Sequence, residues 1–296
     1  MELNIRHWGN GTYRLITALQ PGALLADLER SLVVPLMKDA GVLLFRGFAT
    51  SLEQMSAFVE RHSGRVTLDP ARAFHAKNVQ KVDAGFEPLG LHCENGVAPG
   101  APDYVWFYCQ RAARVASQTT VCDGVRVWET LSDETRALFS AHRIKFTRTF
   151  APAAWKRWVA VEHPTVKNEQ DVRPEHLVEL ISRFEGQTVR PLGDDRVHTE
   201  FCIPAIYKSA DGRWAFANSL LGPSYNYDAP RVTTDDDVAI PDSVWEDVRT
   251  ATAAMTEDID WCDGDVVLID NTRVMHGRRR IEDPDRLLFA ALSTAR

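Results

Sequence analysis

Two separated fragments of this chain carry side chains that commonly bind metals. His92 and Glu94 lie in Leu-Gly-Leu-His-Cys-Glu-Asn, and His276 lies in Asn-Thr-Arg-Val-Met-His-Gly-Arg. Side chains alternate across a strand, so His92 and Glu94 on one strand would point to the same side, while Cys93 would point away. Two imidazoles and one carboxylate on one face of an octahedral metal suit non-haem Fe(II) and oxygen chemistry. The pattern therefore predicts an oxygen-activating iron site made of His92, Glu94 and His276.

A second H-x-E fragment, His198-Thr-Glu200, competes with the first for the role of chelating pair. An isolated H-x-E is usually an ordinary pair of strand residues. We favour His92 and Glu94 because an aromatic strand-like run, Tyr104 to Cys109, and a β-branched run, Thr119 to Cys122, follow them.

Composition permits an enzyme of this kind and excludes several other classes. At 296 residues and 45% hydrophobic, the chain can bury a substantial core. A formal net charge of −7 argues against a general nucleic-acid binder. No apolar run is long enough to cross a bilayer, and no secretory signal pattern opens the chain. The five cysteines include no C-x-x-C pair, which favours free thiols in a reducing compartment, so we expect a cytoplasmic protein with no membrane partner.

Short apolar and β-branched runs alternate with helical patterns along the chain. The pattern predicts helices at 23–32, from Ser51 onward, at 176–184 and at 241–255, and Pro35 disfavours a long continuation of the first helix. It predicts strands at 41–45, 104–109, 119–122, 201–207, 214–217, 266–269 and 287–292. Asp263-Gly264-Asp265 is expected to be a turn. The pattern predicts a mixed α and β protein with a β-dominated core, an antiparallel sandwich or barrel with flanking helices. We interpret residues 1–296 as a single domain, with the polar segment 151–196 as a lid-like insertion.

With these fragments in order, the chain resembles the taurine dioxygenase / clavaminate synthase-like superfamily of Fe(II)- and 2-oxoglutarate-dependent oxygenases. The resemblance begins at Gly41-Val-Leu-Leu-Phe-Arg-Gly-Phe48 and continues through His92-Cys-Glu94 and Thr119-Thr-Val-Cys-Asp-Gly124. It ends with Trp261-Cys-Asp-Gly-Asp265, the His276 motif and Arg286. It implies a double-stranded β-helix, the jelly-roll fold, with Fe(II) as cofactor and 2-oxoglutarate and O2 as co-substrates.

By this resemblance, His92, Glu94 and His276 are the iron ligands and the catalytic centre. Thr119 and Arg286 match the family residues that hold the far carboxylate of 2-oxoglutarate. A guanidinium suits that task because it forms two parallel hydrogen bonds and stays charged. Arg286 could instead be a surface ion-pair partner of an aspartate nearby.

Departures from the family pattern narrow the range of substrates that we expect. Sulfonate- and aryloxyacetate-oxidising members place a second arginine four residues after the clamp, where this chain has Ala290. Glu94 in place of aspartate resembles members that hydroxylate amino acids, free or tethered to carrier proteins. The family's usual Gly-Gly before the threonine is replaced here by Ala116-Ser117-Gln118.

These features together predict a dioxygenase that hydroxylates an aliphatic carbon of an amino-acid-like substrate, free or carrier-tethered, in natural-product or antibiotic biosynthesis. Arg278, Trp155 and Trp158 are candidate substrate contacts, and a homo-oligomer is compatible with the sequence. The same iron site could instead catalyse desaturation or cyclisation. Two further classes remain open, a non-catalytic jelly-roll binding protein and a zinc hydrolase, since two histidines and one glutamate also suit catalytic zinc.

Overall fold

The architecture is taken from a computed structural model that describes residues 1–67, 78–82, 85–97, 100–223 and 228–295. The helices are η1 (Leu25–Asp27), α1 (Arg30–Ala40), α2 (Leu52–His62), α3 (Gly124–Thr130), α4 (Asp133–Ala141), α5 (Pro152–Glu162), η2 (Glu169–Asp171), α6 (Pro174–Ile181) and α7 (Asp242–Met255). The strands are β1 (Leu3–Trp8), β2 (Tyr13–Ala18), β3 (Val42–Arg46), β4 (Val66–Thr67), β5 (Gln80–Lys81), β6 (Leu89–His92), β7 (Tyr104–Arg111), β8 (Thr119–Asp123), β9 (Ile144–Phe150), β10 (Gln187–Pro191), β11 (Val197–Ile203), β12 (Tyr207–Lys208), β13 (Trp214–Ala215), β14 (Arg231–Thr234), β15 (Thr256–Ile259), β16 (Val266–Asp270), β17 (Val274–Arg278) and β18 (Leu287–Ser293).

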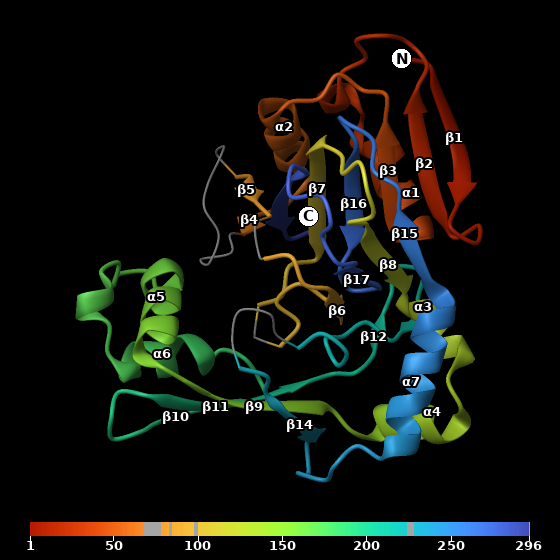
Figure 1. Ribbon diagram of the computed structural model, residues 1–296. Helices are drawn as coiled ribbons and strands as arrows, with labels where there is room; N and C mark the ends of the chain where they lie inside the picture. Colours follow the sequence, from red (N-terminus) through yellow and green to blue (C-terminus); the bar gives the residue numbers. More distant parts are fainter. Residues whose placement is uncertain (68–77, 83–84, 98–99, 224–227, 296) are drawn as a thin grey trace.

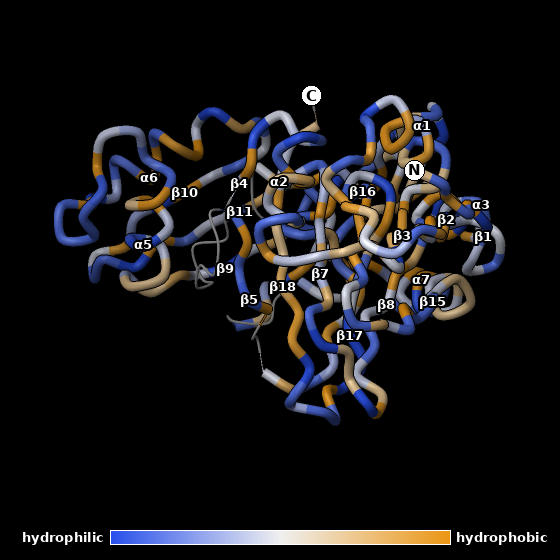
Figure 2. The backbone as a smooth tube through the Cα atoms, turned by 90° about the horizontal axis from the view of Figure 1, so that it is seen from above, coloured by the Kyte–Doolittle hydropathy of each residue, from blue (hydrophilic) through white to orange (hydrophobic). Residues whose placement is uncertain are grey.

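Two sheets form the central sandwich. The larger, 8-stranded sheet runs β1-β2-β3-β16-β7-β18-β4, with β5 paired to β18, and the smaller sheet runs β15-β8-β17-β6. Their inner faces share one hydrophobic cluster, which includes Val105 and Phe107 of β7, Val121 of β8 and Val267 of β16. Strand β16 is buried along its whole length because helices cover the other face of the large sheet. Hydrophobic stretches are visible in these central strands and also in the separate α5–α6 unit (Figure 2).

Helices cover both outer faces of the sandwich. Residues of α1 and α2 pack on the large sheet, and residues of α3, α4 and α7 pack on the small sheet (Figure 1). Helix α2 shows how local sequence and packing agree. Its N-cap, Ser51, accepts a hydrogen bond from the Gln54 backbone N–H at 3.2 Å, and its buried face carries Met55, Phe58 and Val59.

A third sheet, β10-β11-β9-β14, lies beyond the sandwich and carries α5 and α6. These two helices stand to one side of the central sheets in both views of the chain (Figures 1 and 2). Trp155, Val159, Leu177 and Leu180 form their own hydrophobic cluster with β11. The segment 151–196 therefore contains α5, η2, α6 and β10, while its role as an insertion in one domain stays a prediction.

The predicted fold class is confirmed: the chain has mixed helices and strands around a β-rich core. The helix expected over 23–32 was wrong in its bounds, because residues 25–27 form η1 and α1 begins at Arg30 and continues through Pro35 to Ala40. Proline removes one helical hydrogen bond, and burial of Val33, Met37 and Ala40 against the large sheet outweighs that loss. Among the described residues, no helix has the length and apolar character needed to span a bilayer.

Candidate active site

The structure brings His92, Glu94 and His276 together. Their candidate ligand atoms all lie within 4.8 Å of one another. Glu94 Oε2 is 3.4 Å from His276 Nε2 and 4.0 Å from His92 Nε2, and the two imidazole rings have centroids 4.4 Å apart. Glu94 and His276 are buried and His92 is partly exposed, so the cluster faces a limited opening.

Direct strand pairing explains why two histidines so far apart in sequence meet. His92 of β6 and His276 of β17 are Cα partners in an antiparallel ladder, which places both side chains on the same face. The register shifts between His276 and Arg278. Gly277 lies at this irregularity, where a Cβ atom would come within 2.6 Å of the Leu89 carbonyl oxygen. The close approach of β6 and β17 therefore requires glycine at this position.

Glu94 differs from the expectation that it shares a strand with His92. Strand β6 ends at His92, and Glu94 begins a turn. Asn271 fixes this turn: its side-chain oxygen accepts the Glu94 N–H at 2.7 Å, and its amide nitrogen donates to the Glu94 carbonyl at 3.1 Å. Asn271 also donates to the Pro102 carbonyl at 2.8 Å. The Glu94 carboxylate thus reaches the histidines because Asn271, in the connection between β16 and β17, holds the turn in place by hydrogen bonds.

Cys93 points away from the cluster, as predicted, and packs in the hydrophobic cluster on the outer side of the small sheet. Burial raises the pKa of its thiol. The Ser219 hydroxyl contacts its backbone twice, accepting the Cys93 N–H at 3.2 Å and donating to the Cys93 carbonyl at 3.0 Å. Cys93 therefore helps to hold the turn and does not face the ligand atoms.

The far nitrogen of each histidine ring has a different environment. His92 Nδ1 lies 2.9 Å from the Gly90 carbonyl, which is satisfied when Nδ1 carries the hydrogen and leaves the Nε2 lone pair directed at the cluster. His276 Nδ1 is buried and finds no hydrogen-bond partner within the described part of the chain. The ring of His276 instead packs edge-on against Phe107, with centroids 5.5 Å apart.

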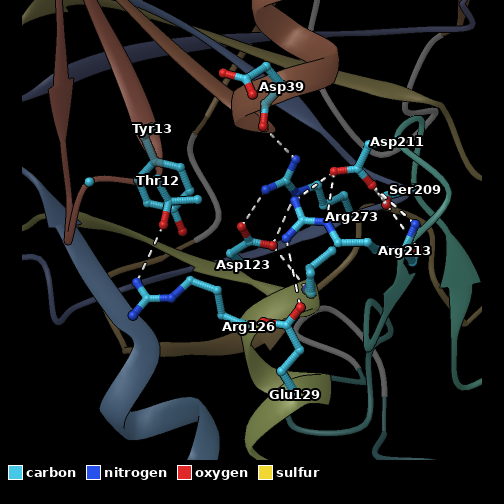
Figure 3. A network of polar contacts seen from close by, with 12 residues as sticks. Thr12, Tyr13, Asp39, Asp123, Arg126, Glu129, Ser209, Asp211, Arg213 and Arg273 are labelled. Carbon is cyan, nitrogen blue, oxygen red and sulfur yellow. Dashed lines mark hydrogen bonds and ion pairs between the residues drawn. The ribbon is translucent and has the colours of Figure 1, made fainter.

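An ion pair buried under the start of β17 anchors the strand that carries His276. Arg273 and Asp123 have side chains 2% exposed, and Arg273 donates to both carboxylate oxygens, at 3.1 and 2.7 Å (Figure 3). Arg273 also donates to the Asp39 carbonyl at 2.9 Å. Burial alone would lower the pKa of Arg273, but the hydrogen bonds and charge of Asp123 raise it. This pair joins the end of β8 to the start of β17.

The competing pair, His198 and Glu200, lies on β11 in the third sheet, with His198 Nε2 3.5 Å from Glu200 Oε1. In the described residues, no third metal-binding side chain joins it. The geometry therefore favours the His92 cluster over this pair.

Thr119, Arg278 and Arg286 converge beside the histidine cluster. Thr119 and Arg278 are direct Cα partners on β8 and β17, so their side chains share the inner face with His276. Burial, and then repulsion from Arg278, lower the pKa of Arg286 to about 10. Within the described chain, Arg286 forms no ion pair with a carboxylate, and Asp283 and Asp285 interact with Arg114 instead. This end of the inner face therefore carries two guanidinium groups and a hydroxyl beside the histidine cluster, which suits an anion.

Ser117 joins the segment before Thr119 to the turn before Arg286. Ala116 and Ser117 adopt left-handed backbone angles, with φ of 43° and 67°, at the positions where the family pattern has glycines. The Ser117 hydroxyl accepts the N–H groups of Glu282 and Asp283, at 2.9 and 3.2 Å. Its carbonyl accepts a hydrogen bond from Arg286 Nη1 at 2.6 Å. The strained loop therefore orients the guanidinium, a role that the sequence did not indicate.

Comparison with known proteins places this geometry in a family. The family model described as taurine catabolism dioxygenase TauD, TfdA family matches residues 16–292. The chain belongs to the TauD/TfdA family. A curated relative, the dapdiamide synthesis protein DdaC of Enterobacter agglomerans, is 25% identical over 268 residues, which cover 83% of this chain and 80% of the relative.

Solved structures share the TauD/TfdA fold at low sequence identity. AAD-2 in complex with Mn(II) and N-oxalylglycine has a TM-score of 0.65 and 15% identity, covering 100% of this chain and 98% of that one. A taurine dioxygenase from Burkholderia xenovorans has a TM-score of 0.64 and 14% identity, covering 99% and 90%. PvcB from Pseudomonas aeruginosa has a TM-score of 0.60 and 13% identity, covering 99% and 91%. These likenesses confirm the jelly-roll fold.

As a TauD/TfdA member, the protein is an oxidoreductase that uses Fe(II), 2-oxoglutarate and O2. The residues present fit such an iron ion. They offer two imidazole nitrogens and one carboxylate oxygen from one side, the donor set of non-haem Fe(II) oxygenases. Ligand atoms that are neighbours around such an ion lie about 3 Å apart, given metal–ligand distances near 2.1 Å. The observed 3.4 and 4.0 Å need only small side-chain adjustments.

Two of the predicted substrate contacts in this TauD/TfdA member lie in the α5–α6 unit. Trp155 is buried in that unit, and its indole N–H donates to the Asp195 carbonyl at 2.9 Å. Trp158 packs against the same hydrophobic cluster. Contact of either ring with a substrate stays a prediction. Ala290, where other members have an arginine, is buried in the inner core of the sandwich.

Proposed function

We propose that the protein hydroxylates an aliphatic carbon of an amino-acid-like substrate, free or tethered to a carrier protein, in a natural-product pathway. The observation that carries the proposal is the His92–Glu94–His276 cluster beside Thr119 and Arg286, because Arg286 forms no ion pair with a carboxylate among the described residues. Two relatives support the pathway: DdaC is a dapdiamide synthesis protein, and PvcB is an Fe, alpha-ketoglutarate dependent oxygenase from an isonitrile synthetic pathway. Desaturation or cyclisation at the same site remains the alternative outcome.

In this proposal His92, Glu94 and His276 hold the iron. The iron and its 2-oxo acid supply the oxidising chemistry that breaks an unactivated C–H bond. The Gly90 carbonyl holds His92 in the tautomer that presents Nε2, and Asn271 holds the turn that presents the Glu94 carboxylate. The chain's contribution is thus a fixed, partly buried set of ligands on one side of the cavity.

The distal carboxylate of 2-oxoglutarate would lie between Thr119 and Arg286. Arg286 supplies a charge that is costly in the ligand-free protein, as its lowered pKa indicates, and a bound carboxylate relieves that cost. Arg278 is a second cation at the same end and remains our candidate for contact with the substrate. The buried carbons around Phe107 and Val121 exclude water from the reacting side.

An anaerobic titration of the Fe(II)-loaded protein with 2-oxoglutarate tests the site. The visible charge-transfer band of the chelated 2-oxo acid should form with the wild type, disappear with His276→Ala and require much more ligand with Arg286→Met. His198→Ala is the matched control, since it removes the imidazole of the competing H-x-E fragment, and it should leave the band unchanged. A band that survives His276→Ala but is lost with His198→Ala would overturn the assignment.

The substrate class is tested by mass spectrometry of products. The Fe(II)- and 2-oxoglutarate-loaded protein would be incubated with a panel of amino acids and N-acyl amino acids, each free and loaded on a carrier protein. A gain of one oxygen atom supports hydroxylation, whereas a loss of two hydrogens supports desaturation or ring formation. Succinate formed only with taurine and other sulfonates would contradict the proposed class.

A further inference from the structure

Trp261 contacts Thr119, the threonine of the proposed carboxylate-binding site. Its indole N–H donates to the Thr119 hydroxyl oxygen, with Nε1 and Oγ 3.1 Å apart. Ile259 of β15 is the Cα partner of Thr119 on β8. Trp261 lies two residues beyond Ile259, so the chain carries its ring back over the same face of the sheet. The contact is therefore made by neighbouring strands whose register is fixed.

The direction of this hydrogen bond constrains the hydrogen of the Thr119 hydroxyl. An indole N–H is a donor only, so it occupies a lone pair of Oγ and leaves the O–H hydrogen to be donated elsewhere. The Thr119 hydroxyl donates to no group in the described part of the chain. Its cross-strand neighbour Arg278 and the nearby Arg286 also carry only donors. The Arg278 Nη2 group donates to the Glu87 carbonyl and Arg286 Nη1 to the Ser117 carbonyl. The Thr119 hydroxyl hydrogen is thus available to an acceptor that binds beside the two arginines.

The turn that holds Trp261 is itself fixed. Asp265 is fully buried and accepts the Cys262 N–H at 2.8 Å. Arg46 from β3 donates to both oxygens of the same carboxylate, at 3.0 Å and 2.7 Å. Trp261 also packs against the inner cluster of the sandwich. The indole therefore has little freedom to leave Thr119.

We infer that Trp261 is a positioning residue for the co-substrate: it orients the Thr119 hydroxyl so that its hydrogen is donated to the distal carboxylate of 2-oxoglutarate. The inference rests on the proposed roles of Thr119 and Arg286. Trp261 does not itself touch the carboxylate. Its effect on binding therefore depends both on the Thr119 hydroxyl and on the ligand having a distal carboxylate.

A double-mutant cycle tests this dependence. Dissociation constants for 2-oxoglutarate would be measured by anaerobic titration of the Fe(II)-loaded wild type, Trp261→Phe, Thr119→Val and the double variant. Loss of one oriented hydrogen bond should weaken binding about five-fold in Trp261→Phe. The same change made in the Thr119→Val background should have almost no further effect. Binding of 2-oxopentanoate, which has a methyl group in place of the distal carboxylate, should be unchanged by Trp261→Phe.

Trp106→Phe provides a matched control outside the site. Trp106 is a fully buried tryptophan, whereas Trp261 is partly buried, and the Trp106 indole N–H likewise donates to a hydroxyl, that of Ser293, at 2.9 Å. Both Trp→Phe variants should lower the melting temperature by a few degrees, but only Trp261→Phe should weaken 2-oxoglutarate binding.

Equal losses from Trp261→Phe in the wild-type and Thr119→Val backgrounds would overturn the inference, as would equal weakening of both 2-oxo acids. Failure of the proposed function has a different signature, in which Thr119→Val and Arg286→Met leave the affinity for 2-oxoglutarate unchanged.

Discussion

Replacing Arg286 by methionine is expected to stabilise the ligand-free protein while it weakens 2-oxoglutarate binding. Burial and the charge of Arg278 lower the pKa of Arg286 from 12.5 to about 10. Each pKa unit is worth about 1.4 kcal/mol, which sets an upper limit of about 3 kcal/mol for the cost of the folded charge. Solvent screening of a partly exposed group reduces this to about 2 kcal/mol. The variant also loses the hydrogen bond to the Ser117 carbonyl, worth about 1 kcal/mol.

We therefore expect the free energy of unfolding of ligand-free Arg286→Met to exceed that of the wild type by about 1 kcal/mol, which raises the melting temperature by about 2 °C. The pH dependence has a definite sign. Because the folded pKa is lowered, the unfolded chain binds the proton more tightly, so the cost is fully present below pH 10 and is relieved as the pH rises from about 10 toward 12.5. The comparison therefore belongs at neutral pH. Loss of a charged partner for the carboxylate should weaken 2-oxoglutarate binding about 100-fold.

Scanning calorimetry with and without 2-oxoglutarate, on Mn(II)-loaded protein, measures both effects. Arg46→Met is the contrasting control, because Arg46 grips the buried carboxylate of Asp265 and that hydrogen bond raises the pKa of Arg46. Removing it leaves a buried carboxylate without its cation and should cost about 3 kcal/mol. If Arg286→Met lowered the ligand-free melting temperature as much as Arg46→Met, or if 2-oxoglutarate stabilised Arg286→Met as much as the wild type, the reasoning would be refuted.

Two further predictions concern residues that hold the site in place. Ser117→Ala and Ser117→Gly both remove the hydroxyl that fixes the turn before Arg286, so both should weaken 2-oxoglutarate binding about three-fold in the charge-transfer titration. Ser117→Ala loses the hydrogen bonds of the hydroxyl and keeps the left-handed strain, so it should lower the melting temperature. Ser117→Gly loses the same hydrogen bonds but relieves the strain, which offsets the loss. Equal melting temperatures of the two variants would contradict this account. Asp123→Asn leaves Arg273 buried without its counter-charge and should cost about 4 kcal/mol in urea unfolding; a cost under about 1 kcal/mol would show that the pair does not anchor β17.

The sequence predicted those parts of the fold that depend on local pattern. The strand at Val266–Asp270 and the helix at Asp242–Met255 were expected within one residue of their bounds. Helix α1 was not, because its passage through Pro35 depends on burial against a sheet built from distant strands. Helix α5 was missed for the same reason, since its apolar face packs on a sheet outside the local sequence window.

The site was predictable where a residue's type alone carries the chemistry, as for His92, Glu94 and His276. The residues that hold these three side chains in place were not predictable. Asn271 acts on Glu94 across 177 positions, and Trp261 acts on Thr119 across 142. Neither contact leaves a local periodicity or charge pattern. Their roles follow only from the pairing of strands that are distant along the chain.

The pairing of β6 with β17 has a consequence for how the protein matures. No short peptide from this chain contains both histidines, because His92 and His276 lie far apart in the sequence and meet only where β6 pairs with β17. If these histidines hold iron as proposed, the metal would not act as a template around which the unfolded chain collapses, unlike the metal ions of small metal-dependent domains. Folding must first close a long loop, a slow step for any β-rich protein. We therefore expect iron at the proposed site to be loaded after folding, so that its uptake would report completed folding and would not drive it.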